Sequence, residues 1–274
     1  MITNQFPETK GGPMANTPAP SRGRFVWFDL MTTDVAAASK FYGSLLGWKT
    51  EEFDMGPAGK YQMIKAGTQG VGGFMQLDKK QPVPSHWIAY MSTDDVDKTT
   101  ARAKELGAKV HMPPTDIPNV GRFSVVADAQ GAVFSPFKSS QPDMPEPEIP
   151  AVGTFCWSEA MTTDPAAAAK FYSDLFGYTV EEKDMGPMGT YRLLNRGARQ
   201  TAGVMKKPDA SPVSMWLHYI AVADVDASTR NAKEIGAQVH MPPMDIPGIG
   251  RFSVLGDPTG ATIALFTGAP PQKK

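Results

Sequence analysis

Side chains that bind metals or form disulfides are scarce in this sequence. Its 274 residues include one cysteine, Cys156, and four histidines. A single cysteine cannot form an intrachain disulfide, so nothing in the sequence indicates an oxidising compartment. Because its neighbours Phe155 and Trp157 are aromatic, we interpret Cys156 as a buried strand thiol rather than as a nucleophile.

Long apolar runs and an excess of one charge are also missing. No window approaches the roughly 18 continuous apolar residues of a membrane span, and the first residues lack the apolar stretch of a signal peptide. The 27 Lys and Arg residues nearly balance the 28 Asp and Glu residues, whereas a nucleic-acid binder needs a basic excess. We therefore expect a soluble cytoplasmic protein that binds neither membranes nor nucleic acid.

Three motifs with well-defined chemistry are absent as well. The chain has no G-x-G-x-x-G after a strand, no P-loop and no G-x-S-x-G, so nucleotide binding and serine hydrolysis have no support. The sequence does contain 41% hydrophobic residues with 26 glycines and 25 prolines. This composition is typical of a globular chain with many turns.

The most informative feature is an internal repeat. The segment Met31-Thr-Thr-Asp34 recurs as Met161-Thr-Thr-Asp164, an offset of 130 residues. His111-Met-Pro-Pro114 recurs as His240-Met-Pro-Pro243, an offset of 129 residues that implies one deletion. Such self-similarity indicates two copies of one structural unit.

The repeat predicts the domain organisation. Prolines concentrate between the copies, which is typical of a semi-rigid linker. The predicted segments are a disordered N-terminal segment at 1–24, domain 1 at 25–137, a proline-rich linker at 138–153, domain 2 at 154–266 and a C-terminal tail at 267–274.

Each copy has a simpler pattern within it. A strand over Phe25–Leu30 precedes a helix that begins at Asp34 and ends at Gly47, and three short strands follow. The pattern restarts with a strand over Trp87–Ser92, a helix over 95–106 and three more strands, of which the first is expected near Lys109–Met112. The sequence therefore predicts an α+β fold with four βαβββ modules.

These elements carry short motifs that resemble the vicinal oxygen chelate superfamily, which includes glyoxalase I, bleomycin-resistance proteins and extradiol dioxygenases. The resemblance covers both copies and implies tandem glyoxalase-like domains whose curved mixed sheets enclose clefts. The loop over 113–123 resembles a bacterial branch of the superfamily. The motifs are Asp34, Phe41-Tyr42, Leu46-Gly47, Asp94-Asp-Val-Asp97 and Asp128-Ala-Gln-Gly131, with Phe171-Tyr172, Phe176-Gly177, Asp224-Val-Asp226 and Asp257-Pro-Thr-Gly260 in the second copy.

Enzymes of this superfamily hold a divalent metal with His and Glu side chains on inward-facing strand positions. None of the matching positions here is His, Asp, Glu or Cys, the residues that bind such metals. We therefore expect no standard metal site and no cofactor. A relocated site that pairs His111 with Asp116, or His240 with Asp245, stays open as an alternative. The matching positions are Trp27, Gly73, Ile88 and Ser135 in the first copy, and Trp157, Gly203, Leu217 and Ala264 in the second.

Strand alternation places a carboxylate beside each of two tryptophans on the face that would line the cleft: Asp29 beside Trp27, and Glu159 beside Trp157. Perturbed carboxylates collect at functional sites, so one interpretation is a polar anchor or general base in an aromatic pocket. The other is an ion pair with Arg122 or Arg251, or exposure at the rim of the sheet.

Further rings fall at matching positions of the two copies. Rings with a polar tip suit a flat or amphipathic ligand, although such residues also serve as plain core. Trp87 and Trp216 alternate with Tyr90 and Tyr219 and are expected to face the helices. The predicted ligand-binding residues are Trp27, Asp29, Tyr61, Tyr90 and Phe123, with Trp157, Glu159, Tyr191, Tyr219 and Phe252.

The sequence thus predicts a glyoxalase- or bleomycin-resistance-like protein without the standard metal site, which binds a small organic molecule in aromatic-lined clefts. The alternatives are a lyase or dioxygenase-type enzyme with a relocated metal, and a protein whose fold serves only as an interaction scaffold. No catalytic residue is assigned, and whether a reaction occurs stays open. Fusion of two copies supplies the pairing that single-domain relatives obtain by dimerising, so we expect a monomer or a homodimer.

Overall fold

The computed structural model of the protein describes residues 22–54, 60–78, 80, 83–186, 189–208 and 213–269. Most of the predicted N-terminal segment and the end of the predicted tail lie outside the described residues. Among the helices in the described ranges, none has the length and apolar character needed to cross a membrane.

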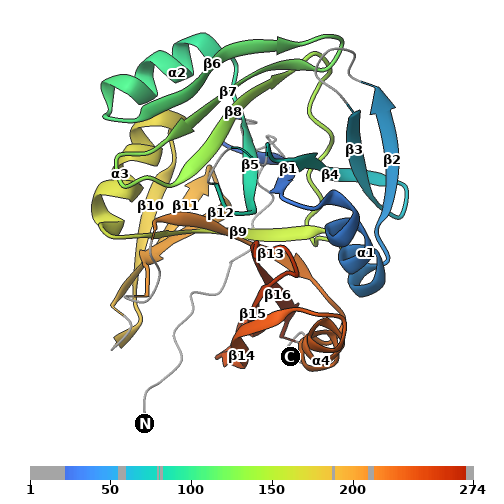
Figure 1. The fold of residues 1–274 in the computed structure, drawn as a ribbon. Coiled ribbons are helices and arrows are strands. Elements are labelled where there is room, and N and C mark those ends of the chain that lie inside the picture. Colours follow the sequence, from blue (N-terminus) through green and yellow to red (C-terminus); the bar gives the residue numbers. More distant parts are fainter. Residues whose placement is uncertain are drawn as a thin grey trace.

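Each copy of the repeat forms one eight-stranded mixed sheet with two helices, which confirms the predicted tandem βαβββ architecture (Figure 1). The first copy contains β1 (Phe25–Thr32), α1 (Val35–Leu46), β2 (Lys49–Asp54), β3 (Lys60–Ala66), β4 (Gln69–Gln76), β5 (His86–Ser92), α2 (Val96–Glu105), β6 (Lys109–Ile117), β7 (Gly121–Ala127) and β8 (Val133–Ser139). The second contains β9 (Phe155–Thr162), α3 (Pro165–Phe176), β10 (Thr179–Asp184), β11 (Thr190–Arg196), β12 (Arg199–Lys206), β13 (Met215–Ala221), α4 (Val225–Glu234), β14 (Gln238–Ile246), β15 (Gly250–Gly256) and β16 (Thr262–Gly268).

The two sheets have the same strand order. In the first it is β2-β3-β4-β1-β5-β8-β7-β6, and the second repeats it as β10-β11-β12-β9-β13-β16-β15-β14. The central strands β1 and β5 are antiparallel, whereas β1 pairs with β4, and β5 with β8, in parallel. The middle of each sheet is therefore built from strands of both modules of one copy.

Local chemistry sets the helix boundaries that the sequence predicts. The Asp34 side chain accepts a hydrogen bond from the Ala37 N–H at the start of α1, and Asp164 does the same at the start of α3. Helix α1 ends at Gly47 with φ of 70°, a left-handed conformation that glycine adopts without a steric penalty.

Strand β6 is longer than predicted. It runs to Ile117, whereas the prediction ended it at Met112, and it includes the pair Pro113-Pro114. The difference has a physical reason. β6 is an edge strand with two register shifts, and proline, which lacks an N–H donor, is tolerated at such positions.

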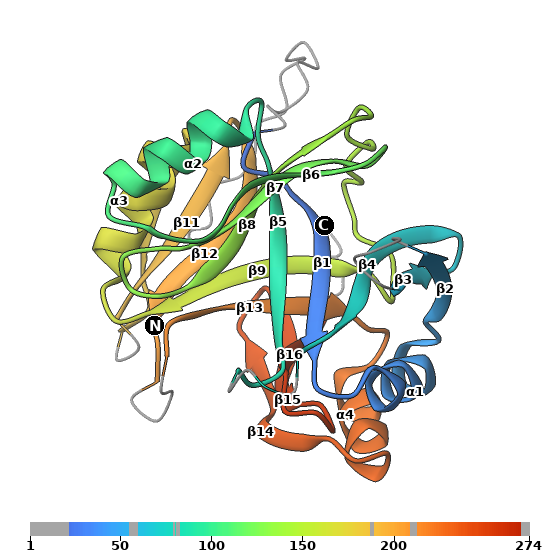
Figure 2. The same cartoon turned by 45° about the horizontal axis from the view of Figure 1, so that its top comes forward.

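The hydrophobic core lies where the helix-covered faces of the two halves meet. Helix α1 lies beside α4, and α2 lies beside α3, so each helix pair joins the two copies (Figures 1 and 2). One buried cluster combines Leu30 and Tyr42 of the first copy with Ile220 and Leu255 of the second. Neither half buries this face without the other.

Aromatic hydrogen bonds cross the boundary between the halves. As predicted, Trp87 and Trp216 face the helices, and their indole N–H groups donate to Tyr42 at 3.2 Å and Tyr172 at 2.9 Å. The Tyr42 hydroxyl then donates to Asp257 of the other half at 3.0 Å.

The symmetry-related bond has the same geometry. Tyr172 donates to Asp128 at 2.9 Å, and both groups are buried. Burial raises the pKa of Asp128, and burial next to Asp128 raises the pKa of Tyr172. A buried carboxyl that loses its phenol donor keeps its desolvation penalty, so these bonds tie the two halves together.

We expect Tyr172→Phe to lower the free energy of unfolding by about 1–3 kcal/mol, because the Asp128 carboxyl loses a buried donor while the ring is retained. Urea unfolding followed by far-UV circular dichroism measures the difference. Lys170→Ala is the matched control on the same helix, because it removes only an exposed ion pair with Asp174. An equal effect of the two substitutions would contradict this account of the bond.

Candidate functional site

The face of each sheet opposite the helices carries the predicted site residues. In β1, Phe28 and Leu30 point into the shared core, so Trp27 and Asp29 lie on the other face, which we call the cleft face. Asp29 is paired with Gly73 of β4 and Ile88 of β5. The cleft-face residues thus come together across the middle of the sheet.

The first cluster is centred on the Asp29 carboxyl, which is only 3% exposed. The Tyr61 hydroxyl donates to Asp29 Oδ1 at 2.8 Å, and the Trp27 indole N–H donates to the same oxygen at 3.0 Å. The indole also lies 2.6 Å from the Tyr61 hydroxyl. Tyr90 and the Gly73 backbone supply further hydrogen bonds. A carboxyl removed from water is thus surrounded by neutral donors.

The second cluster repeats this arrangement around Glu159, which is 6% exposed. Tyr191 donates to Glu159 Oε2 at 2.8 Å, and Tyr219 donates to Oε1 at 3.2 Å. Trp157 donates to the Tyr191 hydroxyl at 3.0 Å. The longer side chain therefore divides the two tyrosines between its oxygens, whereas Asp29 receives Tyr61 and Trp27 on one oxygen.

Burial controls the protonation of both clusters. It raises the pKa of Asp29 and of Glu159, and the donated hydrogen bonds oppose part of that rise. Burial and the adjacent carboxylate also raise the pKa of Tyr61 and Tyr191, so both phenols stay protonated at neutral pH. Each cluster is a chain of hydroxyl, indole and carboxyl groups in which a proton on the carboxyl is favoured more than in water.

Two glycines make room for the tyrosines. A Cβ added at Gly73 would lie 2.1 Å from the Tyr61 hydroxyl oxygen, and one added at Gly203 would lie 1.8 Å from that of Tyr191. A side chain at either glycine would require the tyrosine to move. Each tyrosine therefore occupies the space into which any longer residue at the neighbouring glycine would project.

Phenylalanines extend each cluster along its sheet. The Phe123 ring lies 6.0 Å from Tyr90, and the Phe252 ring lies 6.1 Å from Tyr219. These phenylalanines are partly exposed, as is Trp157. The ten residues predicted from the sequence thus lie as two groups of five, one on each sheet.

The structure excludes the ionic alternative for the carboxylates. Arg122 pairs with Asp97 at 2.7 Å and Asp116 at 2.8 Å, and Arg251 pairs in the same way with two aspartates of its own half. The low exposure of Asp29 and Glu159 likewise excludes a place at the rim. Both carboxyls are held by hydrogen bonds from neutral side chains instead.

The residues at the superfamily's metal positions do not fit the divalent metal that the resemblance implies. Trp27 pairs with Tyr90, and Tyr90 with Ser135, so the matching positions are neighbours on the cleft face. Their side chains provide no carboxyl and no imidazole, and the one carboxyl beside them in the first half, that of Asp29, is surrounded by neutral phenol and indole groups. His and carboxylate donors in the number that such a metal needs are not present there.

Metal-binding side chains do not cluster elsewhere in the part of the chain that the structure describes. It contains no group of three or more His, Cys, Asp and Glu residues placed to hold a metal. His111 and His240 are exposed, and Asp116 and Asp245, their suggested partners, bind arginines.

His218 of β13 points away from the cleft. Its ring is fully buried in the core between the halves, 5.0 Å from Phe28. Its Nδ1 lies 2.9 Å from Ser158 Oγ. Burial lowers the pKa of His218 to about 3, so this imidazole is neutral at physiological pH.

Comparisons with known proteins agree with this geometry. A family model described as the Glyoxalase/Bleomycin resistance protein/Dioxygenase superfamily matches residues 24–135 and 155–265. "Putative glyoxylase CFP32" of Mycobacterium tuberculosis is 34% identical over 249 residues, covering 90% of this chain and 95% of that protein. "Anthracycline biosynthesis protein DnrV" of Streptomyces peucetius is 32% identical over 259 residues, covering 89% and 92%.

Solved structures share the fold at low identity. The Mn(II)-bound glyoxalase from Novosphingobium aromaticivorans is similar with a TM-score of 0.59 and 17% identity, covering 91% of this chain and 82% of that one. The 2,2',3-trihydroxybiphenyl 1,2-dioxygenase from Sphingomonas wittichii has a TM-score of 0.62 and 14% identity, covering 92% and 91%.

The raised pKa values of Asp29 and Glu159 predict a dependence of stability on pH. The stability that each protonated carboxyl contributes is fully present below its unfolded pKa, 3.8 or 4.5, and is lost as the pH rises through the folded value. The double variant Asp29→Asn, Glu159→Gln cannot titrate at these positions. We expect the unfolding free energy of the natural protein, minus that of the variant, to fall as the pH rises from about 4 towards neutrality.

Urea unfolding at a series of pH values measures this difference. Asp94→Asn, which changes an exposed carboxylate outside the clefts, is the control and should give a nearly constant difference. A difference for the double variant that stays constant or grows with pH would refute the assignment.

Cys156 is expected to resist thiol reagents. Burial raises its pKa to about 12, and its Sγ lies 3.4 Å from the Tyr219 carbonyl oxygen. Because the thiolate is the reactive form, labelling by a disulfide reagent at pH 8 should be far slower in the native protein than after unfolding in guanidinium. Native labelling at the rate of free glutathione would show that the thiol is a usable nucleophile.

Proposed function

Because the chain belongs to the glyoxalase/bleomycin resistance protein/dioxygenase superfamily, we propose that it binds a small organic molecule on the cleft face of each half, without the superfamily's standard metal site. The observation that carries this proposal is the repeated cluster of one buried carboxyl, two tyrosines and one tryptophan. Polar groups that converge in an aromatic surface are what a binding site for a small planar ligand requires.

The chemistry of the cluster favours a ligand with hydroxyl or carbonyl groups on a flat ring. The Asp29 carboxyl and the Tyr61 hydroxyl offer both a donor and an acceptor, and a ring lies against Trp27 or Phe123. The relative from Streptomyces peucetius is named for anthracycline biosynthesis, and anthracyclines are flat, hydroxylated aromatic molecules. Its name is therefore consistent with this ligand class.

The two halves differ at the carboxyl. Asp29 is one methylene shorter than Glu159 and holds Tyr61 and Trp27 at a single oxygen, so the ligand-facing donors are arranged differently in the two clefts. We propose that the halves bind with different affinities. Titration of a single ligand would then give two unequal binding steps.

An alternative function is a lyase or dioxygenase-type reaction at a relocated metal. The name of the mycobacterial relative, which has a glyoxylase assignment, favours it. Elemental analysis of protein purified without chelators separates the two. Stoichiometric zinc, nickel, iron or manganese would overturn the metal-free proposal, whereas metal far below one equivalent per chain agrees with it.

A ligand screen tests the binding proposal directly. The full chain is heated with a panel of hydroxylated aromatic compounds, aldehydes and thiol adducts, and a ligand that binds the folded state raises the melting temperature. For each compound that does so, we expect Asp29→Asn with Glu159→Gln to weaken binding about tenfold, the size of effect that loss of one buried hydrogen bond has. Asp94→Asn is the control and should leave the affinity unchanged.

Trp27→Ala and Trp157→Ala provide the second arm. Because they remove the ring wall and leave the carboxyl, they should weaken binding of the same compound, each mainly in its own half. A compound whose affinity is unchanged in all three cleft variants binds elsewhere. A screen in which every compound behaves so would refute the assignment of the clefts.

A further inference from the structure

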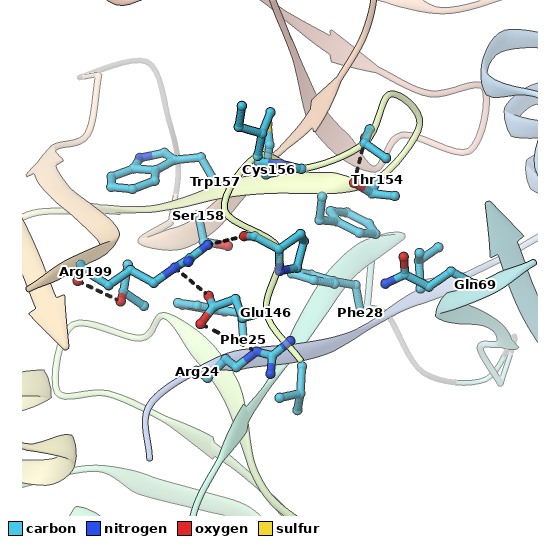
Figure 3. A pocket seen from close by; sticks show the side chains of 18 of the residues that line it. Arg24, Phe25, Phe28, Gln69, Glu146, Thr154, Cys156, Trp157, Ser158 and Arg199 are labelled. Carbon is cyan, nitrogen blue, oxygen red and sulfur yellow. Dashed lines mark hydrogen bonds and ion pairs between the residues drawn. The ribbon is translucent and has the colours of Figure 1, made fainter. Parts of the chain in front are cut away.

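A cavity of about 240 Å³ lies between the two halves and shares one lining residue, Trp157, with the second cleft. Its walls come from the starts of β1 and β9, from β4 and β12, and from the linker over 146–151. Figure 3 shows the Glu146 carboxylate of the linker between the guanidinium groups of Arg24 and Arg199, with the Phe25 ring close by. The cavity therefore combines charged groups with an aromatic wall.

The two copies contribute equivalent positions to this cavity, but with different charge. Phe25 and Phe155 are equivalent at the repeat offset of 130 residues, and both line it. Arg199 has Gln69 as its equivalent, so the repeat alone does not account for the positive charge. The same holds for Arg24, whose equivalent is Thr154. The two arginines therefore make the cavity asymmetric in charge, because the equivalent positions in the other copy are neutral.

A single carboxylate, that of Glu146, faces three arginines. Arg199 Nε lies 3.1 Å from Glu146 Oε1, and Arg24 Nε lies 3.8 Å from Oε2. Arg196, whose side chain is 2% exposed, also contacts Oε2. Asp143 adds a more distant attraction to Arg24. The three arginines around Glu146 therefore carry more positive charge than its carboxylate neutralises.

The same arginines hold the linker backbone. Arg24 donates to the Met144 and Pro145 carbonyls, and Arg199 donates to the Pro147 carbonyl at 2.6 Å. Glu146 and its neighbours are thus fixed by guanidinium groups and not by a hydrophobic core. Planar guanidinium groups bind carboxylates in general, so an external carboxylate satisfies them equally well.

We propose that this cavity binds a small aromatic carboxylate, which displaces Glu146 from Arg24 and Arg199 and places its ring against Phe25 and Phe155. The class of ligand follows from the internal occupant, which is a carboxylate, and from the rings that line the remaining space. Displacement of Glu146 removes the linker's side-chain ion pairs, whereas the bonds from Arg24 and Arg199 to linker carbonyls do not involve that carboxylate. The site shares Trp157 with the second cleft but contains none of the cleft carboxyls or tyrosines, and it does not depend on the function proposed for the clefts.

Calorimetric titration of the full chain with sodium benzoate at pH 7 tests the proposal, with benzyl alcohol as the neutral comparison. We expect benzoate to bind in preference to the alcohol. Glu146→Gln should tighten benzoate binding about tenfold or more, because the internal competitor loses its charge while the arginines remain. Adding Arg199→Gln, which introduces the residue of the equivalent position, should reverse this gain.

Two controls locate the effect. Arg102→Gln, which removes an exposed arginine on α2, should leave benzoate binding unchanged. The cleft variant Asp29→Asn with Glu159→Gln should also leave it unchanged, and loss of binding there would assign benzoate to the clefts and overturn the proposal. If Arg199→Gln prevents folding, Arg24→Thr provides the same comparison from another strand. Equal binding of benzoate and benzyl alcohol by Glu146→Gln would likewise overturn it.

Discussion

The hydrogen bond from Tyr42 to Asp257 crosses from one half of the chain to the other inside an apolar core, and Trp87 donates to the same tyrosine from within the first half. A helix-covered sheet face exposes too much apolar surface to exist alone in water, and here each half covers that of the other. The tyrosine–aspartate pairs fix the relative placement of the halves, because a buried carboxyl must keep its donor. The opposite faces of both sheets are thereby left for other contacts.

The cleft faces also contain a buried carboxyl that accepts a hydrogen bond from a tyrosine, but not at the contact between the halves. Asp29 is buried like Asp257 and is also stabilised by a phenol, but the rings around it stay partly exposed. No cation lies among the donors that hold it, so its protonation responds to whatever enters the cleft. A neutral ligand that supplies a hydrogen bond favours one protonation state, and a charged ligand favours another.

Much of the architecture could be predicted from the sequence because it follows from local chemistry and periodicity. Asp34 and Gly47 set the ends of a helix through local hydrogen bonds and backbone conformation. Strand alternation likewise places Trp27 and Asp29 on one face, independently of which strands pair with β1. The extension of β6 through Pro113-Pro114 could not be predicted, since it depends on the position of that strand at an edge.

The other features that the sequence did not predict depend on contacts between residues that are far apart along the chain. The Tyr61–Gly73 contact joins two strands, and its signal in the sequence is only the recurrence of tyrosine and glycine at Tyr191 and Gly203. The burial of His218 depends on packing against the other half, which no local pattern reports. Arg196 and Arg199 face each other across the β11–β12 hairpin, but nothing in the sequence brings Arg24, which precedes β1, and the linker residue Glu146 to them.

The interlock of tyrosine and glycine on each cleft face also bears on how this chain can change in evolution. Replacing Gly73 by a metal-binding residue such as glutamate introduces a Cβ at 2.1 Å from the Tyr61 oxygen, so that step requires Tyr61 to move away from Asp29. Removing the tyrosine first withdraws a donor from a buried carboxyl. Gain of a metal ligand at this position thus passes through an unfavourable intermediate by either order, and the contact between Tyr191 and Gly203 imposes the same constraint in the second half.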